Sequence, residues 1–194
     1  ADNHIVEPPD LWTSRIESKY QDVAPRIESR EDADYWIVGD NLSVGSVGNA
    51  THPGERYTAK NPHEISVDDR FEAVRKGAYD PDEALKDMAL EGVEGAVIFP
   101  TKGVGGIWMT PDPELLNAIC RTYNDWAAEF CKPYLKALKG AAMINLDSIP
   151  EGIAEMERAN KMGLKVAIIS VHPAHERQYF MPEYDPFWAA AQDM

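Results

Sequence analysis

Cysteine, net positive charge and long apolar runs are all scarce in this sequence. Cys120 and Cys131 are the only two cysteines in 194 residues, too few for a disulfide framework, which favours a reducing cytoplasm. The 19 basic residues are outnumbered by 33 acidic ones, for a formal net charge of −14, and this argues against nucleic acids and anionic membrane surfaces as partners. No window approaches the roughly 18 apolar residues of a membrane span. The polar residues 1–4 lack the pattern of a signal peptide.

What the sequence does contain is the pattern of a globular α/β protein. With 44% apolar and 27% charged residues, a chain of this length can bury one core. From about residue 80, apolar runs of strand length alternate with segments of helical period, which predicts a parallel sheet with right-handed crossover helices. We expect strands near residues 1–6, 95–100, 141–146 and 165–171, and helices near 81–91, 112–131, 150–162 and 185–193.

Two architectures fit this alternation. One is a small open sheet that is complete in itself, and the other is half of a (β/α)₈ barrel, which typically needs about 250 residues. Asp185 is a good N-cap and Pro186 suits the first helical position, so a helix begins there and the sequence stops soon afterwards without a glycine stop signal. This favours a chain cut within a larger fold over a natural C-terminal helix.

The stretch between the first strand and residue 80 has a different character. Residues 26–29 and 35–38 flank a charged turn, which predicts a short hairpin. Residues 39–66 are rich in Gly, Asn, Ser and Pro and predict a long loop, and long loops within compact domains are often functional. We expect one domain over residues 1–194, with an inserted hairpin and loop region at about 20–66.

Asp2 and His4 form the first candidate site. Side chains at i and i+2 of a strand point to the same face, and these two lie at the carboxyl end of the first predicted strand, where barrel enzymes have their active sites. A carboxylate oxygen and an imidazole nitrogen suit Zn²⁺ or a similar divalent ion. Two ligands do not complete a metal site. On spacing alone, the alternative is that Asp2 and His4 are surface side chains that bind no metal.

Two further clusters follow predicted strands. His172 directly follows the strand at 165–171 and His175 lies in the next loop, where they either contact a substrate or are incidental. Lys102 lies in the glycine-containing loop 101–106, which could cradle an anion or line a pocket with Trp108 as an apolar wall. This loop is neither a dinucleotide-binding nor a Walker motif. Tyr123 and Trp126 lie on the apolar stripe of a helix and are expected in the core, and neither cysteine has an adjacent histidine.

Four stretches, in this order along the chain, resemble one family. They are His4–Trp12 (HIVEPPDLW), Asp80–Val97, Tyr123–Trp126 (YNDW) and Tyr184–Ala191 (YDPFWAAA). The first resembles the opening signature of the amidohydrolase-related, metal-dependent enzymes, the group that includes aminocarboxymuconate semialdehyde decarboxylase, and the others are similar to later segments of that family.

This resemblance implies a (β/α)₈ TIM barrel with a divalent metal at its mouth, of which the chain covers about the first four β/α units. Asp2 and His4 match the family's first metal-binding element, so we expect them close enough to share a metal about 2.0–2.2 Å from each ligand atom. Zn²⁺ is the first choice and Mn²⁺ the alternative. Glu7 matches a recurrent acidic position and is expected to orient His4 or a neighbouring cation.

The resemblance also implies residues that this sequence does not contain. Members carry further histidines after the fifth and sixth strands and a catalytic aspartate after the eighth, so the catalytic residues are expected beyond residue 194. Because His172 follows the fourth predicted strand, the metal-ligand role is not transferred to it. The fragment alone is expected to be inactive.

Three functions stay open at this point. The first is non-oxidative decarboxylation of a small carboxylated substrate, aromatic or unsaturated, by a cytoplasmic enzyme whose full-length form is a homodimer. The second is metal-dependent hydrolysis of an amide, ester or lactone. The third, of another class, is a self-contained non-catalytic α/β binding domain without a metal.

Overall fold

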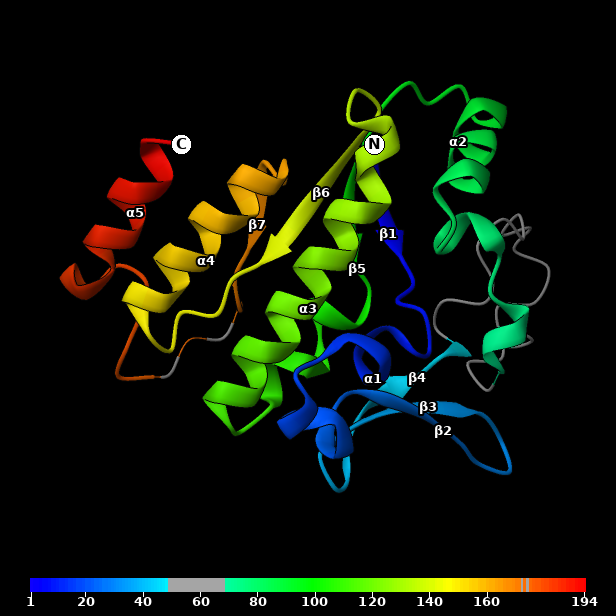
Figure 1. Ribbon diagram of the computed structural model, residues 1–194, viewed down its shortest axis with the longest axis horizontal. Coiled ribbons are helices and arrows are strands. Elements are labelled where there is room, and N and C mark those ends of the chain that lie inside the picture. Colours follow the sequence, from blue (N-terminus) through cyan, green and yellow to red (C-terminus); the bar gives the residue numbers. More distant parts are fainter. Residues whose placement is uncertain (49–68, 172, 174) are drawn as a thin grey trace.

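A four-stranded parallel sheet forms the centre of the computed structural model, which describes residues 1–48, 69–171, 173 and 175–194 (Figure 1). Its strands, in spatial order, are β1 (Asp2–Ile5), β5 (Ala96–Pro100), β6 (Leu138–Met143) and β7 (Val166–Ile168). All three pairings are parallel, as the alternation predicts. β6 begins three residues before the predicted start, because Leu138 to Gly140 pair with Ala96 to Ile98.

Five α-helices are present in the described residues: α1 (Leu11–Arg15), α2 (Pro81–Leu90), α3 (Pro113–Cys131), α4 (Ile149–Met162) and α5 (Asp185–Gln192). The last four agree with the predicted helices. In the part of the chain that the structure describes, seven short 3-10 segments join the elements: η1 (Ser18–Val23), η4 (Phe71–Ala73), η5 (Lys76–Ala78), η6 (Lys102–Val104), η7 (Gly106–Met109), η8 (Lys132–Tyr134) and η9 (Pro182–Tyr184).

The helix ends follow local sequence signals. The Asp80 and Asp112 carboxylates accept hydrogen bonds from first-turn amides of α2 and α3, and a proline follows each aspartate. α4 ends at Gly163, whose φ of 102° favours glycine. The predicted cap at Asp185 is wrong: Asp185 is already helical and Tyr184 takes the cap position, because η9 runs directly into α5.

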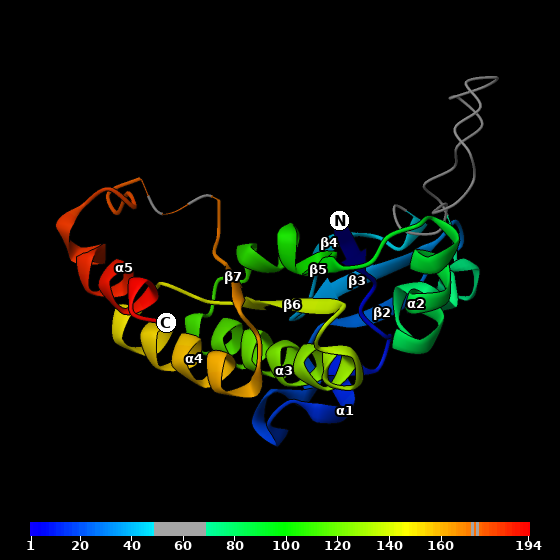
Figure 2. The same cartoon turned by 90° about the horizontal axis from the view of Figure 1, so that it is seen from above.

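The core lies between the parallel sheet and the helices on one side of it. Figure 2 shows α1, α3 and α4 together on that side. The α3 side chains Ile119, Tyr123 and Ala127 are fully buried there, and Trp12 of α1 donates from Nε1 to the Ile119 carbonyl at 3.0 Å. The prediction that Tyr123 belongs to the core is therefore confirmed.

The YNDW motif joins three elements through Asn124, which is fully buried. Its side chain donates to the Met143 carbonyl at 2.9 Å and accepts from the Met143 amide at 2.7 Å, as a neighbouring strand would. Its amide nitrogen also donates to Glu155 of α4 at 2.7 Å. The motif thus fixes α3 against the end of β6 and against α4.

A second, antiparallel sheet has the order β2-β3-β4 and lies near the carboxyl ends of β1 and β5 (Figure 1). It consists of β2 (Arg26–Ser29), β3 (Asp34–Val38) and β4 (Leu42–Ser46). The predicted hairpin is confirmed, with Ser29 opposite Asp34. The prediction of a loop throughout 39–66 is wrong for Leu42–Ser46, which pair with β3. Residues 49–66 lie outside the described residues.

Candidate functional site

Asp2 and His4 lie side by side on β1, on the face that also carries Phe99 of β5. His4 is opposite Phe99 in the parallel register, and the two ring centroids are 5.9 Å apart. His4 Nε2 lies 4.0 Å from Asp2 Oδ1, and the two side chains are 47% and 76% exposed. The i, i+2 spacing therefore brings a carboxylate and an imidazole together on an open face.

The backbone at the end of β5 orients the His4 ring. His4 Nδ1 lies 3.1 Å from the Pro100 carbonyl oxygen. A carbonyl can only accept, so the tautomer that makes this bond carries its proton on Nδ1 and leaves the Nε2 lone pair directed toward the Asp2 side. Metal-binding histidines commonly have such a partner at the second ring nitrogen.

Glu7 contacts the loop after β5 instead of His4. Its carboxylate is fully buried and accepts from the Lys102 amide at 3.0 Å and the Gly103 amide at 3.3 Å. Burial raises the pKa of Glu7 to about 7, although the amide hydrogen bonds and the Lys102 charge act in the opposite direction. Among the described residues Glu7 has no hydrogen bond to His4.

Lys102 is an internal cation in this structure. The residue is only 5% exposed, and Nζ donates to the Ser46 carbonyl of β4 at 2.7 Å. Burial lowers the pKa of Lys102, while the Glu7 charge opposes that shift. In this conformation the ammonium is buried in the fold and bonded to a backbone carbonyl, and contact of Lys102 with a substrate stays a prediction. Trp108, in η7, is partly buried and packs against the core.

The structure does not bring His175, one of the two histidines predicted after β7, to His4. His175 is exposed in the loop after β7, and β7 and β1 are opposite edges of the sheet. His172 lies outside the described residues. The cysteines are buried and free, and burial raises the pKa of both thiols, which agrees with the absence of a nucleophilic context.

Two features near the site were not predicted from the sequence. One is the orienting contact from the Pro100 carbonyl, since backbone groups leave no signal in residue types. The other is the Tyr123 hydroxyl, which is buried and has no hydrogen-bond partner in the described part of the chain. Burial, and secondly the charge of Glu7, raise the pKa of Tyr123, so its hydroxyl belongs to the same buried region as Glu7.

A cavity of about 310 Å³ borders Asp2 and His4 and extends to η5 and α2, where Arg75 pairs with Asp87. It leaves the two candidate donors accessible to a small molecule. Within the described residues, no group of three His, Cys, Asp or Glu side chains could hold a metal ion. Asp2 and His4 therefore form at most part of a metal site.

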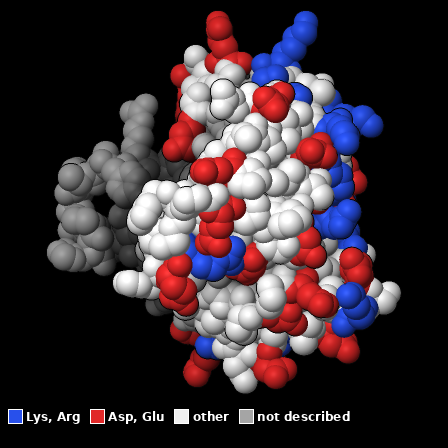
Figure 3. Space-filling view, turned by 90° about the vertical axis from the view of Figure 1, so that its left-hand side faces the viewer, with Lys and Arg blue, Asp and Glu red and all other residues white. Residues whose placement is uncertain are grey.

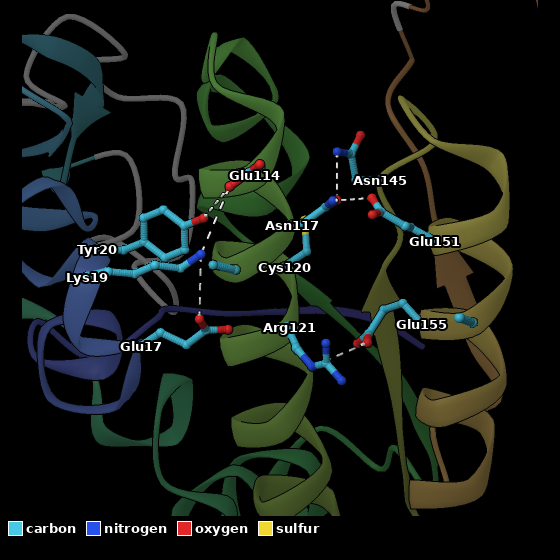
Figure 4. A pocket seen from close by; sticks show the side chains of 12 residues that line it. Glu17, Lys19, Tyr20, Glu114, Asn117, Cys120, Arg121, Asn145, Glu151 and Glu155 are labelled. Carbon is cyan, nitrogen blue, oxygen red and sulfur yellow. Dashed lines mark hydrogen bonds and ion pairs between the residues drawn. The ribbon is translucent and has the colours of Figure 1, made fainter.

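A second cavity of about 310 Å³ lies between η1, α3 and α4 (Figure 4). Its polar side chains are paired with one another: Tyr20 donates to Glu114 at 3.2 Å and Asn117 donates to Glu151 at 2.8 Å. Lys19 lies 3.9 Å from Glu114. Because these groups satisfy each other, we assign no ligand to this cavity.

The model of the amidohydrolase family matches residues 51–194, which is 144 of the 194 residues. The chain belongs to the amidohydrolase family. The amidohydrolases generally bind divalent metals. The family match begins after Asp2 and His4, so their assignment depends on the sequence motif and on the geometry at β1. No curated protein matches the chain in sequence.

Solved structures show which fold this amidohydrolase-family chain has. It matches an amidohydrolase from Mycobacterium avium subsp. paratuberculosis K-10 at 18% identity and a TM-score of 0.71, over 100% of this chain and 54% of that one. It matches 2,6-dihydroxybenzoate decarboxylase from Rhizobium at 24% identity and a TM-score of 0.50, over 58% of this chain and 36% of that one. A 2,6-dihydroxybenzoate decarboxylase complexed with 2,6-dihydroxybenzoate matches at 18% identity and a TM-score of 0.55, over 98% of this chain and 45% of that one.

The chain thus spans about half the length of the Mycobacterium amidohydrolase, which it matches over its whole length. Its four β/α units have the fold of part of a (β/α)₈ barrel, as predicted. No helix of the described residues is long and apolar enough to cross a membrane.

Proposed function

We propose that the protein is a metal-dependent carboxy-lyase that removes CO₂, without oxidation, from a small carboxylated substrate with an aromatic or unsaturated body. Membership of the amidohydrolase family supports an enzymatic role over a self-contained binding domain. The observation that carries the proposal is the pair at β1: the His4 ring is held at Nδ1 by a carbonyl, and its Nε2 lies 4.0 Å from a carboxylate oxygen.

The donor set fits a divalent ion. An imidazole nitrogen and a carboxylate oxygen are ligands that Zn²⁺ accepts, with Mn²⁺ as the alternative. Both side chains are well exposed, so binding requires little desolvation of the surrounding protein. A catalytic zinc has about three protein ligands, so we place the remaining ligands and the proton-transferring residues beyond residue 194.

The residues of this chain would bind and orient rather than transfer protons. When bound, a divalent ion polarises a carboxylate or carbonyl oxygen and lowers the pKa of water. Asp2 and His4 would hold it, and the Pro100 carbonyl would keep the imidazole in the productive tautomer. Phe99, beside His4 on the same face, offers an aromatic surface to a flat substrate.

Hydrolysis of an amide, ester or lactone is the second candidate. It is favoured by one observation, namely that the solved structure matched over the whole of this chain is an amidohydrolase. The same two donors would serve either reaction, because a divalent ion can activate water as well as polarise a carboxylate.

We further propose a cytoplasmic enzyme whose full-length form is a homodimer, with no nucleic-acid or membrane partner. The two cysteines support this location because both are free and buried. The net charge of −14 supports the absence of polyanionic partners.

The test is metal analysis of the full-length protein, followed by a screen of aromatic carboxylates for CO₂ release and of lactones for ring opening. We expect one zinc per chain in the wild type, and loss of metal and activity in Asp2→Asn and His4→Ala. His175→Ala is the matched control and keeps both. A His4→Ala variant that retains its full metal content contradicts the proposed site, and lactone hydrolysis without CO₂ release favours the second candidate.

A further inference from the structure

We propose that Glu7 is a positioning residue for the His4 imidazole and that it acts through the backbone at the end of β5. This inference rests on the proposed function, because it assigns Glu7 to the same site. Direct contact between the two side chains is not involved. The link is the short segment from Pro100 to Gly103.

Glu7 caps the turn that follows β5. Lys102 and Gly103 open η6, so their N–H groups have no partner within the turn. Thr101, which precedes them, makes no side-chain cap. The Glu7 carboxylate, 95 residues away in sequence, takes that place by accepting from both amides.

The same segment holds the His4 ring. Pro100, whose carbonyl oxygen lies 3.1 Å from His4 Nδ1, is separated from Lys102 only by Thr101. β1 and the loop that follows it therefore contact the end of β5 at two points, through His4 and through Glu7. Fixing the Lys102 and Gly103 amides limits how the Pro100 peptide group can rotate, and this sets the direction of the acceptor that the imidazole uses.

The turn after β5 is tightly packed, so it has little room to rearrange if the Glu7 carboxylate is removed. A Cβ at Gly103 would lie 2.4 Å from Met143 Sδ and 2.7 Å from Pro100 Cβ, so this residue is pressed against β6 and the end of β5. On the other side, Lys102 Nζ is held by Ser46. Without the Glu7 carboxylate, two buried amides lose their acceptor in a crowded place, and the strand end must shift to find another.

Asp34 provides a matched control. It is also a buried carboxylate, and it accepts from the Phe71 amide at 3.0 Å and from Arg70 at 3.0 Å. Asp34 belongs to β3 of the second sheet, and its side chain has no hydrogen bond to the segment from Pro100 to Gly103 among the described residues. Removing it tests the loss of a buried carboxylate that bonds a distant backbone amide, without touching the end of β5.

The experiment compares Glu7→Ala, Glu7→Gln and Asp34→Ala with the wild type in the full-length protein. The ¹⁵N chemical shifts of the His4 ring nitrogens are measured in the metal-free protein at a pH where the ring is neutral, and zinc affinity is measured by titration with zinc alone. We expect the wild type to hold the Nδ1–H tautomer. Glu7→Ala should mix the tautomers and weaken zinc binding about 10- to 100-fold, and Glu7→Gln, which keeps an acceptor oxygen, should recover most of both.

Asp34→Ala should lower the unfolding temperature while leaving the His4 shifts and the zinc affinity unchanged. Unchanged His4 shifts in a folded Glu7→Ala protein overturn the inference, as does an Asp34→Ala protein that mixes the tautomers equally. If Glu7→Ala does not fold, Glu7→Gln decides: a small fraction of the second tautomer with a matching small loss of zinc affinity supports the inference, and wild-type shifts with an altered zinc affinity overturn it. A wild type that binds no zinc, with tautomers that still depend on Glu7, contradicts the proposed function and leaves the positioning role standing.

Discussion

At the scale of single residues, Glu7 is subject to two opposing effects. Burial raises the pKa of its carboxyl group, while the amide hydrogen bonds and the Lys102 charge lower it. The Glu7 carboxylate is surrounded by protein and bonded to amides, while Lys102 and Tyr123 are buried in the same region. Burial in these surroundings disfavours the ionised form of the Glu7 carboxyl group and so raises its pKa. The consequence is a dependence of stability on pH that one substitution can isolate.

The first prediction concerns this pH dependence. Because the pKa of Glu7 is raised from 4.5 to about 7, the folded protein retains the Glu7 proton between these pH values while the unfolded chain loses it. The contribution of Glu7 to stability is therefore complete below pH 4.5 and is lost as pH rises through 7, by about 3 kcal/mol in total.

The measurement is the free energy of unfolding in urea at pH 5 and pH 8, for the full-length wild type and Glu7→Gln. The variant should gain on the wild type as the pH rises. Asp34→Asn is the control, since burial of Asp34 is outweighed by hydrogen bonds from Ser29, Phe71 and Arg70 and its pKa is lowered. The difference in unfolding free energy between Asp34→Asn and the wild type should be the same at pH 5 and pH 8. If the difference for Glu7→Gln is also the same at both pH values, the pKa of Glu7 is not raised.

The second prediction concerns the Tyr123 hydroxyl. It is buried without a hydrogen-bond partner in the described part of the chain, so Tyr123→Phe should leave stability unchanged or raise it by about 1 kcal/mol. Tyr184→Phe is the matched control, because the Tyr184 hydroxyl donates to the Arg177 carbonyl at 3.0 Å, and it should destabilise by about 1 kcal/mol. Urea unfolding measures both. A clear loss in Tyr123→Phe indicates a partner for this hydroxyl, such as an internal water.

At the scale of elements, polar side chains connect α3, β6 and α4 within an otherwise apolar core. Asn124 satisfies both backbone groups of Met143 at the end of β6. Arg158 of α4 donates to both oxygens of Glu155, at 2.8 and 2.7 Å, and also pairs with Asp125. The YNDW motif therefore has a structural explanation and needs no role in binding.

The third prediction follows from this joint. Asn124→Ala leaves the Met143 amide and carbonyl without partners in the core and should cost about 2–4 kcal/mol of unfolding free energy. Asn117, about two turns earlier on α3, is only partly buried and bonds to Glu151 and Asn145, so Asn117→Ala should cost less than about 1 kcal/mol. Denaturant unfolding of the full-length variants distinguishes them, and equal losses would show that burial of the Asn124 bonds contributes little.

At the scale of the whole molecule, the sheet has two strand edges without a strand neighbour in the described residues, β1 and β7. Beyond β7, apolar side chains are exposed, including Val171 at 72% and Phe180 at 84%. Figure 3 shows this side of the molecule around α5, where an uncharged area extends between charged residues. Parallel strands are normally covered on both faces and paired at their edges, so the unpaired edges of β1 and β7 agree with part of a larger sheet.

The fourth prediction concerns the 194-residue chain expressed alone. We expect it to self-associate, aggregate or behave as a molten state, because the bare edges expose apolar surface and a half barrel buries too little to outweigh chain entropy. It should be catalytically inactive. Solution mass, thermal unfolding and zinc content measure this, and the double variant Val171→Lys, Phe180→Lys should reduce association. A monomer with a sharp transition and one tightly held zinc contradicts the half-barrel interpretation.

The sequence by itself determined the order and type of the main elements. Apolar runs bounded by Pro-Asp starts and glycine stops identified four parallel strands and four helices, because these signals are local and repeat with the period of each element. The i, i+2 spacing of Asp2 and His4 likewise defined their shared face. The alternation alone could not separate a small complete sheet from part of a barrel, and there the family motifs decided.

Only the tertiary structure decided which groups meet across long sequence separations. Glu7 bonds to amides 95 and 96 residues away, His4 to a carbonyl 96 residues away, and Lys102 to a carbonyl 56 residues away. Nearly every residue has the same backbone N–H and C=O groups, so no pattern of residue types predicts which of them a distant side chain will contact. β4 was missed for a similar reason, since Leu42–Ser46 is rich in small residues and becomes a strand only through the ladder that β3 provides.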